Sequence, residues 1–182
     1  YGDYWYVAAQ LGVEELLFNK ALTSQFLDLA YDLCPEREPQ ETAEWRATIW
    51  SGHMAQAIGV TAIEADDAAE GGTTYLDRLR QRLVQVFEQV DEGITFFERA
   101  ETGRILGRIG DPRPGVGVTE DGLPDILWGG EVPAGTYTIG DGQHDDEAVR
   151  DVEIDEDYQL SRYPVTYAQF QCFVEAEDYD DP

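Results

Sequence analysis

Positive charge is the scarcest property of this sequence. Its 182 residues hold 12 Lys and Arg against 38 Asp and Glu, which gives a formal net charge of −26 at pH 7, and Lys20 is the one lysine. Such a surface repels phosphate backbones and anionic lipid heads, so we expect neither nucleic-acid binding nor membrane binding. The excess of carboxylates is typical of a very soluble protein or of a saline environment. It also suits a surface that binds cations or a basic partner.

Cysteine, catalytic motifs and long apolar runs are scarce as well. Cys34 and Cys172 lie in different segments without Cys-x-x-Cys spacing, so we interpret them as reduced, mostly buried thiols of a cytoplasmic protein. No apolar run approaches the length of a membrane span, and no signal peptide is recognisable. The glycines of residues 110–117 lack the Lys-Ser/Thr of a phosphate-binding loop, and no Ser-His-Asp or Cys-His arrangement is readable.

What is present, a hydrophobic fraction of 42%, predicts a buried core. Residues 1–110 predict short amphipathic helices, and stacked pairs of such helices predict a helical-repeat-like bundle without a strict period. The expected helices are a pair within 4–33, one from Glu41 to Ile58, one over about 75–90, and one over 94–110. In the fourth of these we expect Thr73 or Thr74 as the cap and the side chains of Arg78, Arg80 and Arg82 largely on the polar face.

Residues 111–127 are rich in proline and glycine and predict a linker, after which residues 128–182 predict an α+β unit. "GTYTIG", "VRDVEI" and "YQLSRYPV" are the expected strands. "TYAQFQCFVEAEDY" predicts a helix, because Thr166 followed by Gln169 has the spacing of a capping box. We expect the inward face of this helix to consist of Phe170, Phe173 and Val174.

Two phrases of the second unit have a familiar order and spacing: "VPAGTYTIGD" at 132–141 and "VRDVEIDEDYQLSRYPVTYAQFQCFVEAEDY" at 149–179. They resemble the start of the formylglycine-generating-enzyme family, the sulfatase-modifying-factor domain with a C-type-lectin-like fold. Members open with a G-T-F-x-M-G-like strand and continue to an x-P-V-T-N-x-Q-F helix start, where Ile139 here replaces the usual Met and Tyr167 the usual Asn. Residues 98–116 also resemble the junction that precedes this domain in bacterial signalling NTPases of the NACHT/STAND type.

This resemblance implies where catalysis would reside. The copper-binding cysteine pair of the true oxidases lies beyond the position that corresponds to Pro182, and Cys172 on the first helix of the domain does not match it. Iron-binding relatives use a histidine triad, whereas this chain has two histidines. We therefore expect no cofactor in this chain, and copper or iron only where a catalytic C-terminal half follows. Activity as an enzyme is correspondingly not expected of this chain itself.

An acidic loop is the one candidate ion site. Asp141, His144, Asp145 and Glu147 bring oxygen ligands and an imidazole together, which makes calcium possible and would suit a transition metal at His144. Consecutive carboxylates point in different directions on an extended chain, however, and the alternating spacing of a calcium loop is absent. A solvated acidic loop is the other interpretation.

The sequence is therefore interpreted as α+β, a helical-repeat-like bundle followed by a partial C-type-lectin-like unit. Its last residues, "DYDDP", and its start at Tyr1 lead us to expect a fragment. The first functional hypothesis is a non-catalytic binding or sensor module of a larger bacterial signalling or defence protein, whose partner is a protein or the remainder of a larger polypeptide. The alternatives are the N-terminal part of a metal-dependent formylglycine-generating or sulfoxide-synthase-type oxidoreductase, and a rigid structural spacer. We expect residues 1–110 to fold alone and residues 128–182 alone to be unfolded.

Overall fold

The computed structural model describes residues 12, 15, 23–89, 93–142 and 148–176 of the chain. The chain divides into two compact units, Tyr1–Arg113 and Pro114–Pro182. The described residues combine six helices with two antiparallel two-stranded sheets, so the chain is α+β as predicted. None of the described helices is both long and apolar enough to cross a membrane.

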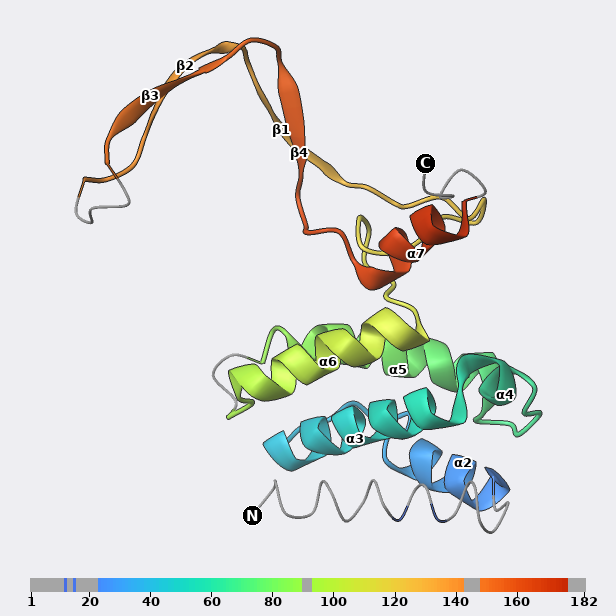
Figure 1. Ribbon diagram of the computed structural model, residues 1–182. Coiled ribbons are helices and arrows are strands. Elements are labelled where there is room, and N and C mark those ends of the chain that lie inside the picture. Colours follow the sequence, from blue (N-terminus) through green and yellow to red (C-terminus); the bar gives the residue numbers. More distant parts are fainter. Residues whose placement is uncertain (1–11, 13–14, 16–22, 90–92, 143–147, 177–182) are drawn as a thin grey trace. The chain divides into compact units, whose positions relative to one another are not determined.

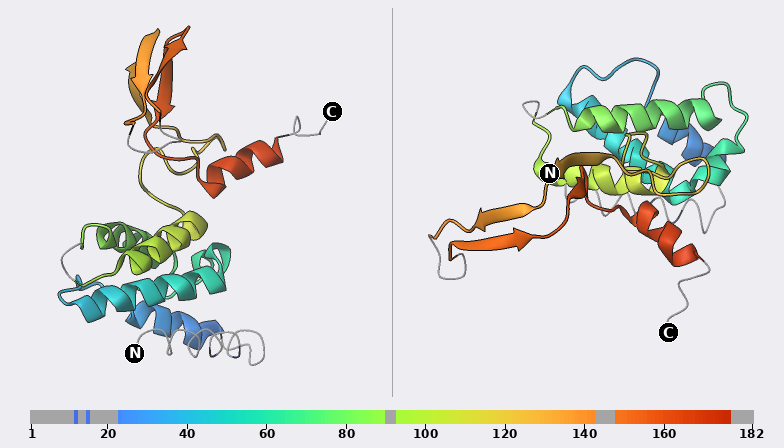
Figure 2. Two further views of the ribbon diagram at one scale, coloured as in Figure 1. Left: turned by 60° about the vertical axis from the view of Figure 1, so that its left-hand side comes forward. Right: turned by 90° about the horizontal axis from the view of Figure 1, so that it is seen from above.

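The first unit is built around its longest described helix, α3, which contacts four other helices. Figures 1 and 2 show how these helices are arranged around it. Its described helices are α2 (Thr23–Asp32), α3 (Thr42–Ile58), α4 (Val60–Glu64), α5 (Gly72–Val86) and α6 (Phe96–Ile109). Helices α2, α5 and α6 all pack on α3, and α4 packs on α3 and α5. The predictions of α2, α3 and α6 are confirmed, whereas the first helix expected within 4–33 lies largely outside the described residues.

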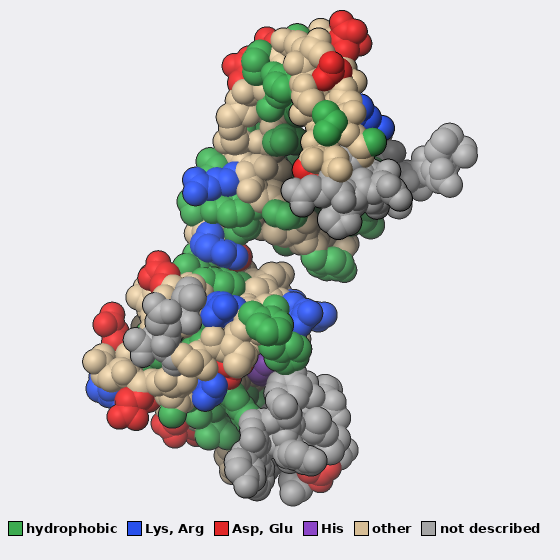
Figure 3. All heavy atoms as spheres, turned by 90° about the vertical axis from the view of Figure 1, so that its left-hand side faces the viewer, with side chains coloured by type: hydrophobic (Ala, Val, Ile, Leu, Met, Phe, Trp, Pro, Cys, Tyr) green, Lys and Arg blue, Asp and Glu red, His purple; other side chains and the backbone are tan. Residues whose placement is uncertain are grey.

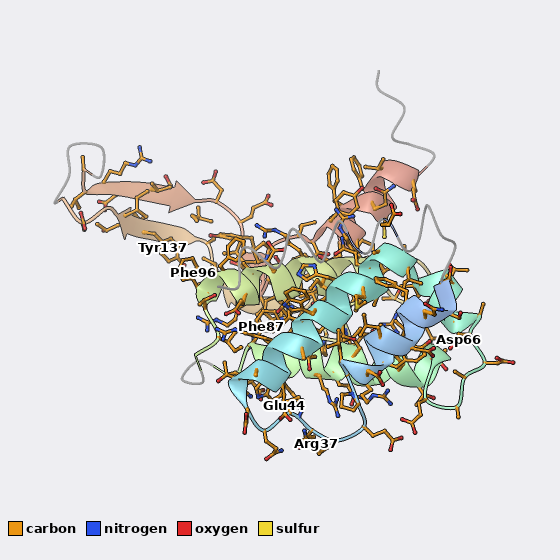
Figure 4. All side chains as sticks on the ribbon, turned by 90° about the horizontal axis from the view of Figure 1, so that it is seen from below. Arg37, Glu44, Asp66, Phe87, Phe96 and Tyr137 are labelled. Atoms are coloured by element: carbon orange, nitrogen blue, oxygen red, sulfur yellow. The ribbon has the colours of Figure 1, made fainter. Side chains whose placement is uncertain are left out.

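The ends of α3 and α6 follow from local chemistry. Glu41 and Glu44 form a capping box at the start of α3, and Arg37 pairs with Glu44 and lowers the pKa of that carboxyl to about 2 (Figure 4). The side chain of Thr95 accepts a hydrogen bond from the backbone N–H of Glu98 at the start of α6. Gly59 ends α3 with a φ of +90°, a left-handed conformation that favours glycine.

The predicted cap of α5 is wrong. Helix α5 begins at Gly72 after Gly71, and neither Thr73 nor Thr74 caps it. The glycines are needed because a Cβ on Gly72 would lie 2.8 Å from the carbonyl oxygen of Asp66. The chain therefore turns into the helix earlier than a threonine cap predicts.

The position of Arg82 also differs from the prediction, since only 5% of this residue is exposed. Its guanidinium donates hydrogen bonds to the carbonyl oxygens of Pro35 and Glu36, the latter at 2.7 Å, and contacts the Sγ atom of Cys34 at 3.6 Å. Arg78 donates from Nε to the carbonyl oxygen of Cys34 at 2.9 Å. A long arginine side chain can cross an apolar layer in this way, because its head reaches backbone acceptors on the other side. Arg82 thus anchors the turn that follows α2.

The interior of this unit is closed. Tyr75 and Ser51 share a buried hydrogen bond of 2.7 Å, and Ser51 Oγ donates to the carbonyl oxygen of Ala30. No buried side-chain nitrogen or oxygen in the described part of the chain lacks a partner. The buried apolar core consists of Phe26, Leu27, Ala30, Tyr31, Cys34, Trp45, Ile49, Met54, Ala55, Ile63, Tyr75, Leu76, Leu79, Leu83, Val86, Ile94, Ile105, Leu106 and Ile109. Burial raises the pKa of the Cys34 thiol, which keeps it protonated.

The second unit contains an antiparallel ribbon and one helix, visible in Figure 1. Its elements are β1 (Trp128–Val132), β2 (Gly135–Ile139), β3 (Arg150–Ile154), β4 (Tyr158–Ser161) and α7 (Tyr167–Glu175). Strand β2 pairs with β3 and β1 pairs with β4, so the chain runs out along β1 and β2 and returns along β3 and β4. The predictions of β2, β3, β4 and α7 are confirmed, whereas β1, with its Gly129–Gly130 pair, was not predicted.

Candidate binding surface of the second unit

The motif that begins α7 binds the loop of residues 115–125, which lies before β1 in the sequence. Thr166 and Gln169 form the predicted capping box. Their side chains also bind the loop: Thr166 Oγ1 donates to the carbonyl oxygen of Val116 at 2.9 Å. Gln169 Nε2 donates to the carbonyl oxygens of Gly115 and Asp125, and only 2% of Gln169 is exposed. The polar residues of this motif therefore join residues 115–125 to the start of α7.

Gly115 makes this contact possible. Its φ is +87°, and its backbone N–H donates to Oδ2 of Asp125 at 2.7 Å. A Cβ at this position would collide with the side chain of Leu127. The sequence predicts residues 111–127 only as a Pro/Gly-rich linker, because Gln169, which binds the carbonyl oxygen of Gly115, lies 54 residues away.

The prediction for the inward face of α7 is wrong. Phe170 and Phe173 are 51% and 55% exposed, Val174 is half-buried, and Gln169 is the buried side chain. Tyr167 is 77% exposed and extends this surface, and the rings of Phe170 and Phe173 lie 5.8 Å apart. We call Tyr167, Phe170 and Phe173 the aromatic face of α7. The sequence rule placed apolar side chains inward, but the buried side of α7 faces a loop whose backbone requires polar partners.

The second unit exposes most of its large apolar side chains, whereas the first unit buries most of its own. Val116 is the one buried hydrophobic side chain in the described part of residues 114–182. Figure 3 shows hydrophobic side chains on the visible surface of this unit. Its exposed large hydrophobic residues are Val118, Leu123, Leu127, Trp128, Ile139, Val149, Tyr158, Leu160, Val165, Tyr167, Phe170 and Phe173. Exposed apolar area of this extent marks interaction sites in soluble proteins.

The bend of the ribbon is fixed by hydrogen bonds rather than by a core. The backbone N–H of Ala134 donates to Oδ1 of Asp157 at 2.7 Å, where the pairing changes from β1–β4 to β2–β3. Tyr137, labelled in Figure 4, donates from its hydroxyl to the carbonyl oxygen of Pro133 at 2.7 Å. These contacts fix the bend between the β1–β4 and β2–β3 strand pairs, while most of the side chains of the four strands stay exposed.

A hollow of about 370 Å³ lies on the β1–β4 strand pair. It is lined by Trp128, Glu131, Asp157, Tyr158 and Gln159. Trp128 is 58% exposed, so its indole is accessible to a ligand. The hollow thus combines aromatic rings with two carboxylates, a combination that the sequence analysis did not identify.

The predicted ion site falls largely outside the described residues. Asp141 is exposed after β2, and residues 143–147, which contain His144, Asp145 and Glu147, are not described. In the described ranges there is no group of three or more His, Cys, Asp or Glu that could hold a metal ion. The ion site and the calcium it would bind therefore stay predictions.

The two cysteines are unpaired thiols in different units, as predicted. Cys34 is buried, while Cys172 on α7 is half-buried and donates from Sγ to the carbonyl oxygen of Ala168 at 3.4 Å. The sequence predicts neither thiol as a catalytic group, and this stays a prediction.

Comparison with known proteins concerns the second unit. No curated protein and no solved structure matches the chain. Residues 127–181, less than a third of the chain, match the model of the family described as the sulfatase-modifying factor enzyme 1-like domain. The match begins at the residue before β1 and includes the ribbon, the Thr166 and Gln169 motif and α7. This segment of the chain is thus similar to the formylglycine-generating-enzyme-like family, as its residues predicted.

Proposed function

We propose that this chain is a protein-binding module, in which a closed helical unit carries a second unit that presents an apolar surface to a partner. The observation that carries the proposal is the contrast in burial. The buried core cluster lies within Phe26–Ile109, whereas Val116 is the one buried hydrophobic residue described after Arg113. A surface such as the aromatic face of α7 is favourable in water once another polypeptide covers it.

The charge of the second unit indicates the kind of partner. Residues 114–182 contain 18 Asp and Glu against two arginines, Arg150 and Arg162, a formal net charge of −16. A second copy of this chain would carry the same charge and would be repelled. We therefore commit to a separate protein with a basic surface around an apolar centre. Opposite charge would steer its approach, and the apolar contacts would supply the affinity.

The finer features of this proposal come from resemblance. The proposal gives the second unit a lectin-like scaffold that displays loops, and it gives the helices a repeat-like arrangement within a larger bacterial signalling or defence protein of the NACHT/STAND type. The family match at residues 127–181 supports the first feature. The packing of α2, α5 and α6 on α3 supports the repeat-like arrangement of the helices. The larger NACHT/STAND-type protein rests on the resemblance of residues 98–116 alone.

A photo-crosslinking amino acid at Phe170 tests this function in the cells that make the protein. We expect a defined crosslinked product with a separate basic protein, identified by mass spectrometry, because Phe170 lies on the aromatic face of α7. The same crosslinker at Gln81, an exposed position on α5, serves as the matched control and should give no such product. Adding Phe173→Ser to the Phe170 crosslinker should abolish the product.

Three outcomes contradict the proposal. A product that contains two copies of the chain would mean self-association, and a crosslink to another segment of the same polypeptide would mean that the surface is internal. The absence of any product at Phe170, with the protein folded, would remove the basis for a protein-binding role.

One observation favours a second candidate, the N-terminal part of a metal-dependent oxidoreductase. The description of the matched family names an enzyme. In this chain the two thiols are separated between the units and Cys34 is buried, so the residues described here offer that candidate a scaffold and no thiol pair. The binding role has the further support of the exposed apolar side chains of the second unit.

A further inference from the structure

The hollow on the β1–β4 strand pair has the chemistry of a cation site. Trp128 contributes an exposed indole, and Glu131 and Asp157 contribute carboxylates. The face of an indole attracts cations, and a carboxylate accepts charge-assisted hydrogen bonds from them. A ligand that binds both the indole and a carboxylate at once needs a planar, positively charged group.

The pairing of the strands places these groups together. Trp128 pairs with Ser161 and Glu131 pairs with Gln159, and residues directly opposite in a ladder share a face of the sheet. Residues three apart in a regular strand would face opposite sides, but the register shifts between Trp128 and Glu131. This irregularity brings the indole and the carboxylate to the same face of the β1–β4 strand pair, because a β-bulge changes the direction in which a side chain points.

Asp157 is the second carboxylate that lines the hollow. Its Oδ1 atom accepts a hydrogen bond from the backbone N–H of Ala134, which holds the carboxylate at the bend of the ribbon beside the hollow. The hollow therefore has a second negative group whose position is fixed by the backbone.

The arginines of this unit lie elsewhere. Arg162 lies 5.8 Å from the centre of the Tyr163 ring, and Arg150 pairs with Ile139 in the β2–β3 hairpin. Neither of them lines the hollow. A cation for this site must therefore come from outside the unit.

We infer that this hollow receives an arginine side chain of the basic partner, an inference that rests on the proposed function. Arginine fits better than lysine, because a planar guanidinium stacks on an indole and donates to a carboxylate in a fixed fork. A bare metal ion is disfavoured, because no group of three potential ligands occurs in the part of the chain that the structure describes. Anionic ligands are repelled by Glu131 and Asp157.

The test uses the full chain and a fluorescent peptide of sequence Gly-Ile-Arg-Ile-Arg-Ile-Gly, with binding followed by anisotropy at low salt. We expect the same peptide with citrulline in place of arginine to bind about tenfold more weakly, because citrulline keeps the shape and loses the charge. A lysine peptide should fall between them. Equal binding of the arginine and citrulline peptides would overturn the inference without any change to the protein.

Matched variants then locate the site. Glu131→Gln should weaken binding of the arginine peptide about tenfold, since it removes the charged acceptor. Glu153→Gln, an exposed change of the same charge on β3, should alter it less than about twofold, the effect of a screened distant charge. Equal losses in the two variants would mean general attraction to an acidic surface and would overturn the inference. That result would leave the crosslink at Phe170 unaffected, so this inference and the proposed function fail in distinguishable ways.

Discussion

Replacing Arg82 by methionine is expected to lower the free energy of unfolding of the helical unit by about 2–4 kcal/mol. Methionine fills much of the same volume but donates no hydrogen bond. The carbonyl oxygens of Pro35 and Glu36, which accept from the Arg82 guanidinium, would then lose their donor in a partly buried turn. Helix α2 depends on this turn for its position on α3, so the loss should reach the core.

The measurement is urea unfolding of the full chain followed by helical circular dichroism. Arg104→Met provides the matched control. Arg104 pairs with Glu101 at the surface, and its side chain is 65% exposed, so this change should cost less than about 1 kcal/mol. Similar losses in the two variants would contradict the anchoring role of Arg82.

Replacing Gly52 by leucine is the second large effect, with an expected loss of about 2–3 kcal/mol in the free energy of unfolding. Gly52 lies where α3 crosses α5 and α6. A Cβ there would be 3.0 Å from Cγ2 of Ile105 and 3.2 Å from Cδ1 of Leu83, and both of those side chains are fully buried. The additional atoms of leucine would have no space without separating the helices.

Gly107→Ala is the informative control for this variant, because it is also a glycine in the interior of a helix. Nothing lies within 4 Å of a Cβ at Gly107, so alanine should raise the free energy of unfolding by up to about 1 kcal/mol through its better helix propensity. Urea unfolding of both variants decides the matter. A neutral Gly52→Leu would contradict the close packing of α3 on α5 and α6.

The sequence predicted the helical unit well where local rules apply. Periodic apolar residues located α3 and α6, and the turn glycines Gly59 and Gly110 ended them. The rules failed where a distant contact decides. Arg82 was predicted on the polar face because nothing local reveals that Pro35 and Glu36 lie within its reach. The start of α5 was displaced for the same reason, by the close approach of Gly72 to Asp66.

The candidate surface was less predictable from sequence. Phe170 and Phe173 have the spacing of an inward face, and that rule assumes a second layer to pack against. In the second unit the side of α7 that is covered contacts loop carbonyls instead, and Gln169 is the residue that satisfies them. The hollow beside Trp128 was not predictable, because it depends on a register shift in β1 and on the pairing of β1 with β4.

The central claim is that the helical unit has a buried core of its own, whereas the second unit exposes the apolar surface that we assign to a partner. Thermal melting by circular dichroism of the separate pieces 1–113 and 114–182 tests it most directly. We predict a sharp cooperative transition for residues 1–113 and a broad transition at lower temperature for residues 114–182, because a two-stranded ribbon without a covered face is marginal in water. A sharp melt of residues 114–182 alone, at a temperature as high as that of residues 1–113, would contradict the account, since it would mean that this unit is fully stable without the contacts that we assign to a partner.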